Sequence, residues 1–116
     1  KNVFALLRGT AGDYKDTILF HGHIDTVGVE DFGHFKEYAF DCDKLLDAML
    51  ASNDIPEVLR KDIETGDYLV GRGSCDMKSG DAVFMVLIKY LSQNPDKLKG
   101  NILVSFNPVE SAYRNY

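Results

Sequence analysis

The run "DTILFHGHI", residues 16–24, predicts a β-strand that ends in two histidines. The run is largely apolar with little alternation, which is typical of a strand covered on both faces. The run "NVFALLRG", residues 2–9, has the same character. Between the two runs, "TAGDYK" supplies the glycine and aspartate of a turn, so both are predicted to be successive strands.

Helices are predicted further along the chain. In "DKLLDAMLASN", residues 43–53, apolar residues recur at helical spacing and Asp43 is a suitable N-cap. Residues 54–67 predict a second short helix with Pro56 in its first turn. The run "SGDAVFMVLIKYLSQNP", residues 79–95, is apolar nearly all round, so we expect a helix buried against a sheet.

Three further segments complete the predicted order of elements. Residues 27–40 show no sustained period and predict a long loop, whereas "YLVGRG" (68–73) and "GNILVSFNP" (100–108) predict strands. The order strand–strand–helices–strand–helix–strand belongs to the α/β class. We therefore expect a mixed sheet flanked by helices, at the size of one domain for 116 residues.

Composition excludes several classes of partner. The net charge of −5 argues against nucleic acid and anionic membranes, which favour clustered basic residues. The longest apolar run, residues 82–88, is too short to cross a bilayer.

Two cysteines, Cys42 and Cys75, are too few for a disulfide framework, so we expect reduced thiols and a cytoplasmic location. The first residue, Lys1, is no initiator methionine, which predicts a piece of a longer protein.

The glycine-rich stretch "LVGRGSCDMKSG", residues 69–80, does not fit a nucleotide-binding loop. A phosphate loop needs glycines where Arg72 and Met77 stand. A dinucleotide loop needs a third glycine where Asp76 stands, and a carboxylate would repel pyrophosphate. Nucleotide binding is therefore not expected.

A metal site is the alternative at the end of the second strand. Residues two apart on a strand share a face, so His23 can offer one ring nitrogen to a metal while Asp25 orients the ring through the other. His21 shares this parity and is the weaker candidate. Asp76 could bridge two ions, and Glu110, at the end of the last strand, could serve as a general base.

Each of these residues also has a purely structural interpretation. An isolated His-x-Asp is commonly only a hydrogen-bonded pair, and an aspartate in a glycine-rich loop is commonly a turn former or helix cap. His34, Cys42 and Cys75 are expected to be structural. Composition and spacing alone leave the metal site and the structural alternative open.

Two motifs together resemble a known family. "HGHIDTV" (21–27) and "VGRGSCDMKSG" (70–80) contain Gly-His-x-Asp and Gly-Arg-Gly-x-x-Asp-x-Lys-x-Gly in order. This pattern is similar to that of the dinuclear zinc superfamily of aminoacylases, glutamate carboxypeptidases and desuccinylases, whose members are metallopeptidases and related amide hydrolases. The longer stretches 21–33 and 62–80 further resemble its bacterial arginine-utilization branch.

The resemblance implies a role for each matching residue. His23 would bind one zinc, Asp76 would bridge both, and Asp25 would orient His23, while Lys78 and Gly80 would have no ligand role. In "SFNPVES", residues 105–111, Glu110 aligns with the catalytic base. Ser111 stands where the family has a metal-binding glutamate, and a hydroxyl is a far poorer zinc ligand.

The resemblance also implies what the chain lacks. The family has a later acidic ligand, a later histidine and a lid domain that commonly mediates dimerisation. We therefore interpret residues 1–116 as the N-terminal portion of a zinc-exopeptidase-like catalytic domain, inactive alone. The intact homodimer would use two zinc ions, or cobalt or manganese, to cleave an N-acyl amino acid or peptide at an amide bond beside a carboxylate-bearing amino acid. The alternative is a non-catalytic α/β metal-binding or interaction module of the same descent.

Overall fold

The computed structural model describes residues 1–13 and 16–108. These residues form two compact units. The first unit combines Lys1–Thr26 with the chain from Cys75 onward, and the second is Val27–Ser74. None of the described helices is both long enough and apolar enough to cross a membrane.

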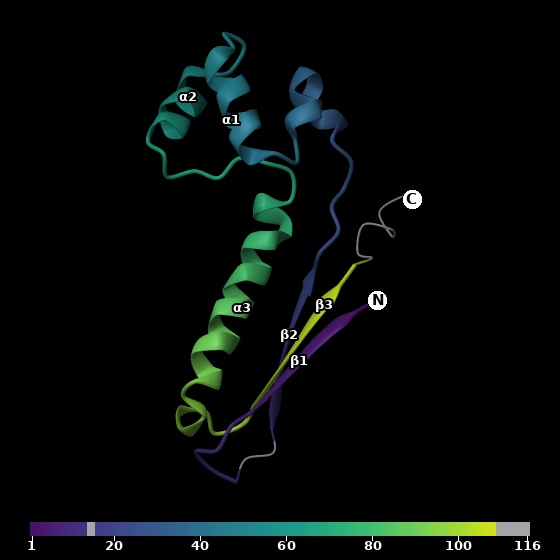
Figure 1. Ribbon diagram of the computed structural model, residues 1–116, viewed down its shortest axis with the longest axis vertical. Coiled ribbons are helices and arrows are strands. Elements are labelled where there is room, and N and C mark those ends of the chain that lie inside the picture. Colours follow the sequence, from purple (N-terminus) through teal and green to yellow (C-terminus); the bar gives the residue numbers. More distant parts are fainter. Residues whose placement is uncertain (14–15, 109–116) are drawn as a thin grey trace. The chain divides into compact units, whose positions relative to one another are not determined.

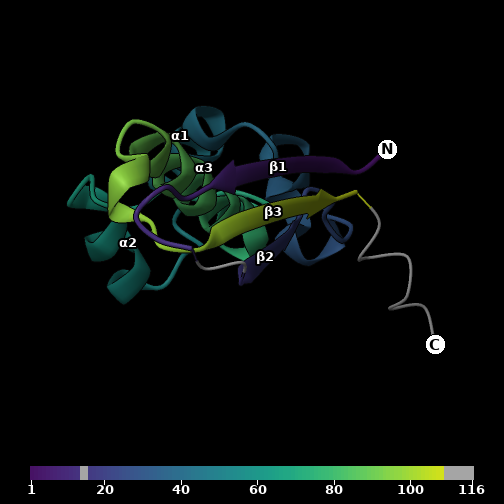
Figure 2. The same cartoon turned by 90° about the horizontal axis from the view of Figure 1, so that it is seen from below.

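The first unit contains a mixed three-stranded sheet, as predicted. Its strands are β1 (Val3–Arg8), β2 (Thr17–His23) and β3 (Asn101–Asn107), in the order β1-β3-β2. Figure 1 shows them as adjacent arrows, and Figure 2 shows β3 between the other two. The central strand β3 runs antiparallel to β1 and parallel to β2. The predicted α/β class with a mixed sheet is therefore confirmed.

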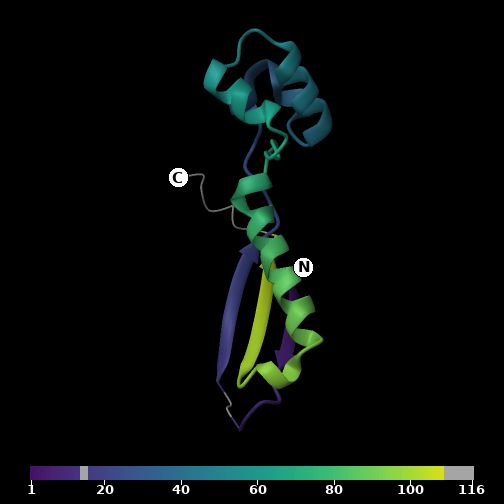
Figure 3. The ribbon, with the colours of Figure 1, turned by 90° about the vertical axis from the view of Figure 1, so that its left-hand side faces the viewer.

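One face of this sheet is covered by helix α3 (Ser79–Ser92), which lies along the strands (Figure 3). Directly paired residues share a face of a sheet, and Phe20, Val104 and Ala5 are paired in this way. The Phe20 ring lies 5.0 Å from the Phe84 ring of α3, so this is the covered face. A short 3₁₀ helix, η3 (Pro95–Lys97), connects α3 to β3.

The prediction that the strands are covered on both faces differs from the structure. Phe4, Leu6 and Leu19 point away from α3 and are 55–61% exposed. Helix α3 is likewise buried on one side only, since Val83 and Val86 are exposed. The apolar runs were correctly interpreted as strands and helix, but the described residues supply a single covering layer.

The second unit has a small helical core of its own. It contains the 3₁₀ segment η1 (Glu30–Tyr38), α1 (Cys42–Ala51) and α2 (Glu57–Glu64). Leu45, Met49 and Ile63 form the buried cluster. Both predicted helices are therefore present in this unit.

Local details of the second unit correct three predictions. The segment expected to be a long loop contains η1, and the N-cap of α1 is Asp41 rather than Asp43, because the Asp41 side chain accepts a hydrogen bond of 3.2 Å from the backbone N–H of Lys44. The predicted strand 68–73 is irregular. This segment is fixed by a backbone hydrogen bond, in which the N–H of Arg72 donates to the carbonyl oxygen of Ala39 at 2.7 Å.

Truncation of Leu45 tests the core of the second unit. This side chain is fully buried, so Leu45→Ala should lower the free energy of unfolding by about 2–5 kcal/mol through lost burial and the cavity left behind. Leu69→Ala is the matched control, because Leu69 is 71% exposed and its truncation should change stability by less than about 0.5 kcal/mol. Urea unfolding followed by circular dichroism measures both, and equal losses would contradict the assignment of the core.

Candidate metal centre

The candidate centre lies where strand β2 ends in the first unit. His23 is the last residue of β2 and is 8% exposed. Asp76 belongs to η2 (Ser74–Lys78), the turn that precedes α3. The His23 Nε2 atom lies 2.9 Å from Asp76 Oδ1. The structure thus brings together two predicted ligands that are 53 residues apart in the sequence.

The other nitrogen of His23 faces Asp25. Nδ1 of His23 lies 3.1 Å from the backbone carbonyl oxygen of Asp25 and 3.4 Å from its Oδ1. Both of these oxygens are acceptors, as is Asp76 Oδ1 on the other side of the ring, so a proton on Nδ1 is directed at Asp25 and a proton on Nε2 is directed at Asp76. Asp25 therefore stands where a residue that fixes the orientation and tautomer of His23 would stand.

The Nδ1–H tautomer, the one that metal binding through Nε2 requires, has a consequence for the contact with Asp76. With the proton on Nδ1, Nε2 carries a lone pair that faces a carboxylate oxygen only 2.9 Å away. Two electron-pair donors this close require a positive centre, either a proton on Nε2 or a metal ion bound by both atoms. Ligand atoms of one tetrahedral zinc, each about 2.0–2.2 Å from the ion, are themselves roughly 3.3–3.6 Å apart, so His23 Nε2 and Asp76 Oδ1 would separate by about 0.5 Å to bind one ion. The nitrogen and oxygen donors present here fit such an ion.

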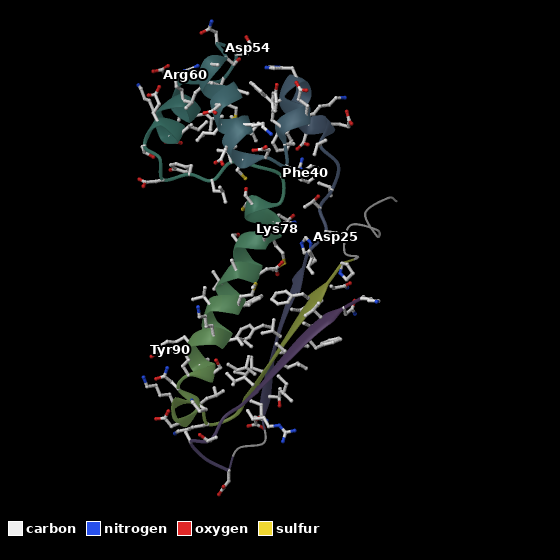
Figure 4. The ribbon with its side chains drawn as sticks, viewed as in Figure 1. Asp25, Phe40, Asp54, Arg60, Lys78 and Tyr90 are labelled. Carbon is white, nitrogen blue, oxygen red and sulfur yellow. The ribbon has the colours of Figure 1, made fainter. Side chains whose placement is uncertain are left out.

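Lys78 fixes the backbone between His23 and Asp25. Its Nζ donates a hydrogen bond of 2.7 Å to the carbonyl oxygen of Ile24. The backbone N–H of Ile24 donates to the carbonyl oxygen of Asn107 on β3 at 2.9 Å. Figure 4 shows Lys78 near the start of α3 and Asp25 just beyond the end of β2. Lys78 thus serves the centre without contributing a ligand atom.

Other predicted residues are not part of this cluster. His21 lies on β2 and is exposed. Glu110, the predicted base, and Ser111 lie outside the described residues. Within residues 1–13 and 16–108, no group of three or more histidine, cysteine, aspartate or glutamate side chains is placed to hold a metal ion. The described part of the chain therefore offers two donors, and the full dinuclear ligand set stays a prediction.

Sequence reasoning missed Asp81, in the first turn of α3. Its side chain is only 8% exposed, and Oδ1 has no hydrogen-bond partner among the described residues. Burial raises the pKa of the Asp81 carboxyl, against the opposing electrostatic effect of His23, Lys78 and His21. The available signal was a carboxylate directly before the apolar run "AVFMVLI" (82–88), in the first turn of the predicted helix and preceded by Gly80.

Asp81 is buried against Gly22 of β2. A Cβ atom at Gly22 would lie 2.0 Å from Asp81 Oδ1, which is closer than van der Waals contact allows. The glycine between the two histidines therefore permits the close approach of α3 to β2. This approach also brings η2, with Asp76, to the end of β2.

Comparison with known proteins gives matches along nearly the whole chain. The sequence model of peptidase family M20/M25/M40 matches residues 19–114. Protein RocB of Bacillus subtilis is 40% identical over 112 residues, which are 97% of this chain and 19% of RocB. The uncharacterized protein YqjN of the same organism is 36% identical over 97 residues, 83% of this chain and 17% of YqjN. The chain thus spans about a fifth of the length of these relatives. No solved structure matches.

A double-mutant cycle tests the contact between Gly22 and Asp81. Gly22→Ala should lower the free energy of unfolding by about 1–3 kcal/mol, because the new methyl group overlaps Asp81 Oδ1. In an Asp81→Ala background the same change should cost less, with a coupling of at least about 0.5 kcal/mol. Urea unfolding of the four proteins measures the coupling, and strictly additive losses would show that the two residues do not meet.

The raised pKa of Asp81 predicts a pH dependence of stability. Because the folded state holds this proton more tightly than the unfolded state, the free energy of unfolding should fall as pH rises from the ordinary value of 3.8 through the raised pKa. Asp81→Asn removes this titration, so its stability relative to the unchanged protein should increase over the same window. Asp96→Asn, which removes an exposed carboxylate, is the control and should follow the unchanged protein. Parallel curves for the Asp81 variant and the unchanged protein would refute the prediction.

Proposed function

The chain belongs to peptidase family M20/M25/M40, and on this premise we propose that it is part of a metal-dependent amidohydrolase or peptidase. The observation that carries the proposal is the His23–Asp76 pair, with Nε2 and Oδ1 2.9 Å apart and Asp25 behind the imidazole. The proposed substrates are small N-acyl amino acids or peptides, cleaved at the amide bond next to a carboxylate-bearing amino acid.

Each residue of the centre would have a separate task. When bound, a divalent ion would polarise the scissile carbonyl and lower the pKa of the attacking water. His23 Nε2 and Asp76 Oδ1 would be the donors that this chain contributes. Asp25 would keep the His23 proton on Nδ1, so that Nε2 stays available. Lys78 would hold the Ile24 carbonyl and thereby the spacing between His23 and Asp25.

Glu110 is proposed as the general base. Its carboxylate would take a proton from water as the oxygen attacks the amide carbon. The same proton would then pass to the amide nitrogen as the carbon–nitrogen bond breaks, which releases a neutral amine. This role rests on the alignment of "NPVES" with the third family motif.

The wider context is proposed from the family and the relatives. We expect two zinc ions in the intact enzyme, with cobalt or manganese as possible replacements because nitrogen and oxygen ligand sets accept several metals. Since the chain spans about a fifth of its relatives, we expect the other ligands and a dimerising lid domain to come from further sequence, and residues 1–116 alone to be inactive. Cytoplasmic arginine utilization is the proposed setting, supported by the similarity to RocB.

Ser111 favours a second candidate function. If this residue truly replaces the metal-binding glutamate, the protein would be a non-catalytic α/β module that binds one metal weakly or serves in protein interaction. The gathering of only two donors in the described residues is compatible with this alternative. The two candidate functions predict different effects of a carboxylate at position 111 on zinc affinity.

Zinc binding by titration calorimetry at neutral pH tests the proposed centre. We expect the 116-residue chain to bind zinc, and His23→Ala to bind at least ten-fold more weakly, because a first ligand is lost. His34→Ala is the matched control and should bind as the unchanged chain does, since His34 belongs to the second unit. If His23→Ala bound zinc as tightly as the unchanged chain, His23 would not be a zinc ligand and the proposed centre would be wrong.

Ser111→Glu separates the two candidate functions in the same assay. If the chain retains the family's site apart from this position, the restored carboxylate should tighten zinc binding at least ten-fold. An unchanged affinity would favour the non-catalytic module. Circular dichroism of each variant confirms that a changed affinity does not reflect unfolding.

A further inference from the structure

The side chain of Met77 packs against both the end of β2 and the first turn of α3. Met77 follows Asp76 in η2 and is partly buried, whereas the Asp76 side chain is 66% exposed. A Cβ atom at Gly80 would lie 3.0 Å from the Met77 Cε atom, and one at Gly22 would lie 3.3 Å from the same atom. The terminal methyl group of Met77 is therefore in close contact with the strand and the helix at once.

The residues on both sides of this contact suit it. Gly22 and Gly80 have no side chains, so the methyl group can approach their backbone directly. Methionine is unbranched and flexible, and it therefore fills the irregular gap between a strand and a helix. The other contact that attaches η2 to the end of β2 is the hydrogen bond of Lys78, which is exposed and open to competition from water. Met77 thus supplies an apolar anchor for η2.

This anchor acts on the backbone that carries Asp76. The φ of −114° and ψ of 99° at Asp76 lie outside the helical region, so regular helical geometry does not set the direction of its side chain. The carboxylate nevertheless lies 2.9 Å from His23 Nε2. Because Asp76 and Met77 are covalent neighbours, a displacement of Met77 would displace the carboxylate. Metal sites require ligand distances within about 0.2 Å of their preferred values, so such a displacement would weaken metal binding.

We propose that Met77 is a positioning residue, which keeps the Asp76 carboxylate opposite His23 Nε2. It does so by packing, and it contributes no ligand atom. The effect on metal binding rests on the proposed function, whereas the placement of Asp76 against His23 does not. Mutation of residues that orient a metal ligand typically weakens metal affinity by about 10–100-fold.

Zinc titration calorimetry of three variants at neutral pH tests this role. Met77→Ala removes the thioether and should raise the zinc dissociation constant about ten-fold. Met77→Leu keeps most of the volume and the apolar character, so it should bind within about two-fold of the unchanged chain. Met85→Ala is the matched control, because Met85 is a methionine of α3 that is 63% exposed, and it should bind as the unchanged chain does. Circular dichroism checks that each variant is folded, and Met77→Val, a milder truncation, replaces Met77→Ala if that variant is not.

NMR without metal tests the placement of Asp76 by itself. In the unchanged chain, nuclear Overhauser effects should connect the Met77 methyl group with the Hα protons of Gly22 and Gly80. Met77→Ala should shift the ring-proton signals of His23, because the carboxylate beside Nε2 moves. Met77→Leu and Met85→Ala should leave these signals in place, which a general loss of stability would not explain.

Unmoved His23 signals in the folded truncation variant, or zinc binding by that variant as tight as that of the unchanged chain, would overturn the proposal. Zinc binding that depends on His23 but not on Met77 would leave the metal centre standing and refute the positioning role. If the unchanged chain bound no zinc while truncation of Met77 alone shifted the His23 signals, the positioning role would be supported and the metal-dependent function would be wrong.

Discussion

The close approach of α3 to β2 at Gly22 is the constraint on which the first unit depends. A side chain at this position would overlap the Asp81 carboxylate, so the glycine lets the first turn of the helix lie directly against the strand. The same approach brings η2 to the end of β2, where Asp76 meets His23. Two neighbouring residues therefore serve different purposes: Gly22 allows α3 to pack against β2, and His23 supplies the imidazole that meets Asp76. His21, on the other side of Gly22, takes part in neither contact.

Two carboxylates at this junction have different electrostatic surroundings. Asp76 is two-thirds exposed and lies against an imidazole nitrogen, so a proton or a metal ion can balance it. Asp81 is buried, and its Oδ1 has no donor in the described part of the chain. Because burial disfavours the charged form, Asp81 lowers the stability of the free chain at neutral pH.

Much of the first unit could be predicted from local patterns. The strands of residues 2–9, 16–24 and 100–108 and the helix of 79–95 follow from runs of apolar residues bounded by turn signals. The predicted strand 68–73 is wrong because its short apolar run ends in glycines: Gly73 has a φ of +82°, which a regular strand does not accommodate. The burial of Asp81 could not be predicted, since it depends on Gly22, which is far from it in the sequence.

The contact between His23 and Asp76 could be predicted from the sequence only by combining the two motifs. Spacing places Asp25 on the same face as His23, which is a local property of a strand. Nothing local places Asp76 there, because the contact joins residues 53 apart and depends on the packing of α3 against β2 at Gly22. The two family motifs therefore predict a contact as well as a chemistry. Neither motif alone predicts that His23 and Asp76 meet, whereas the two together do.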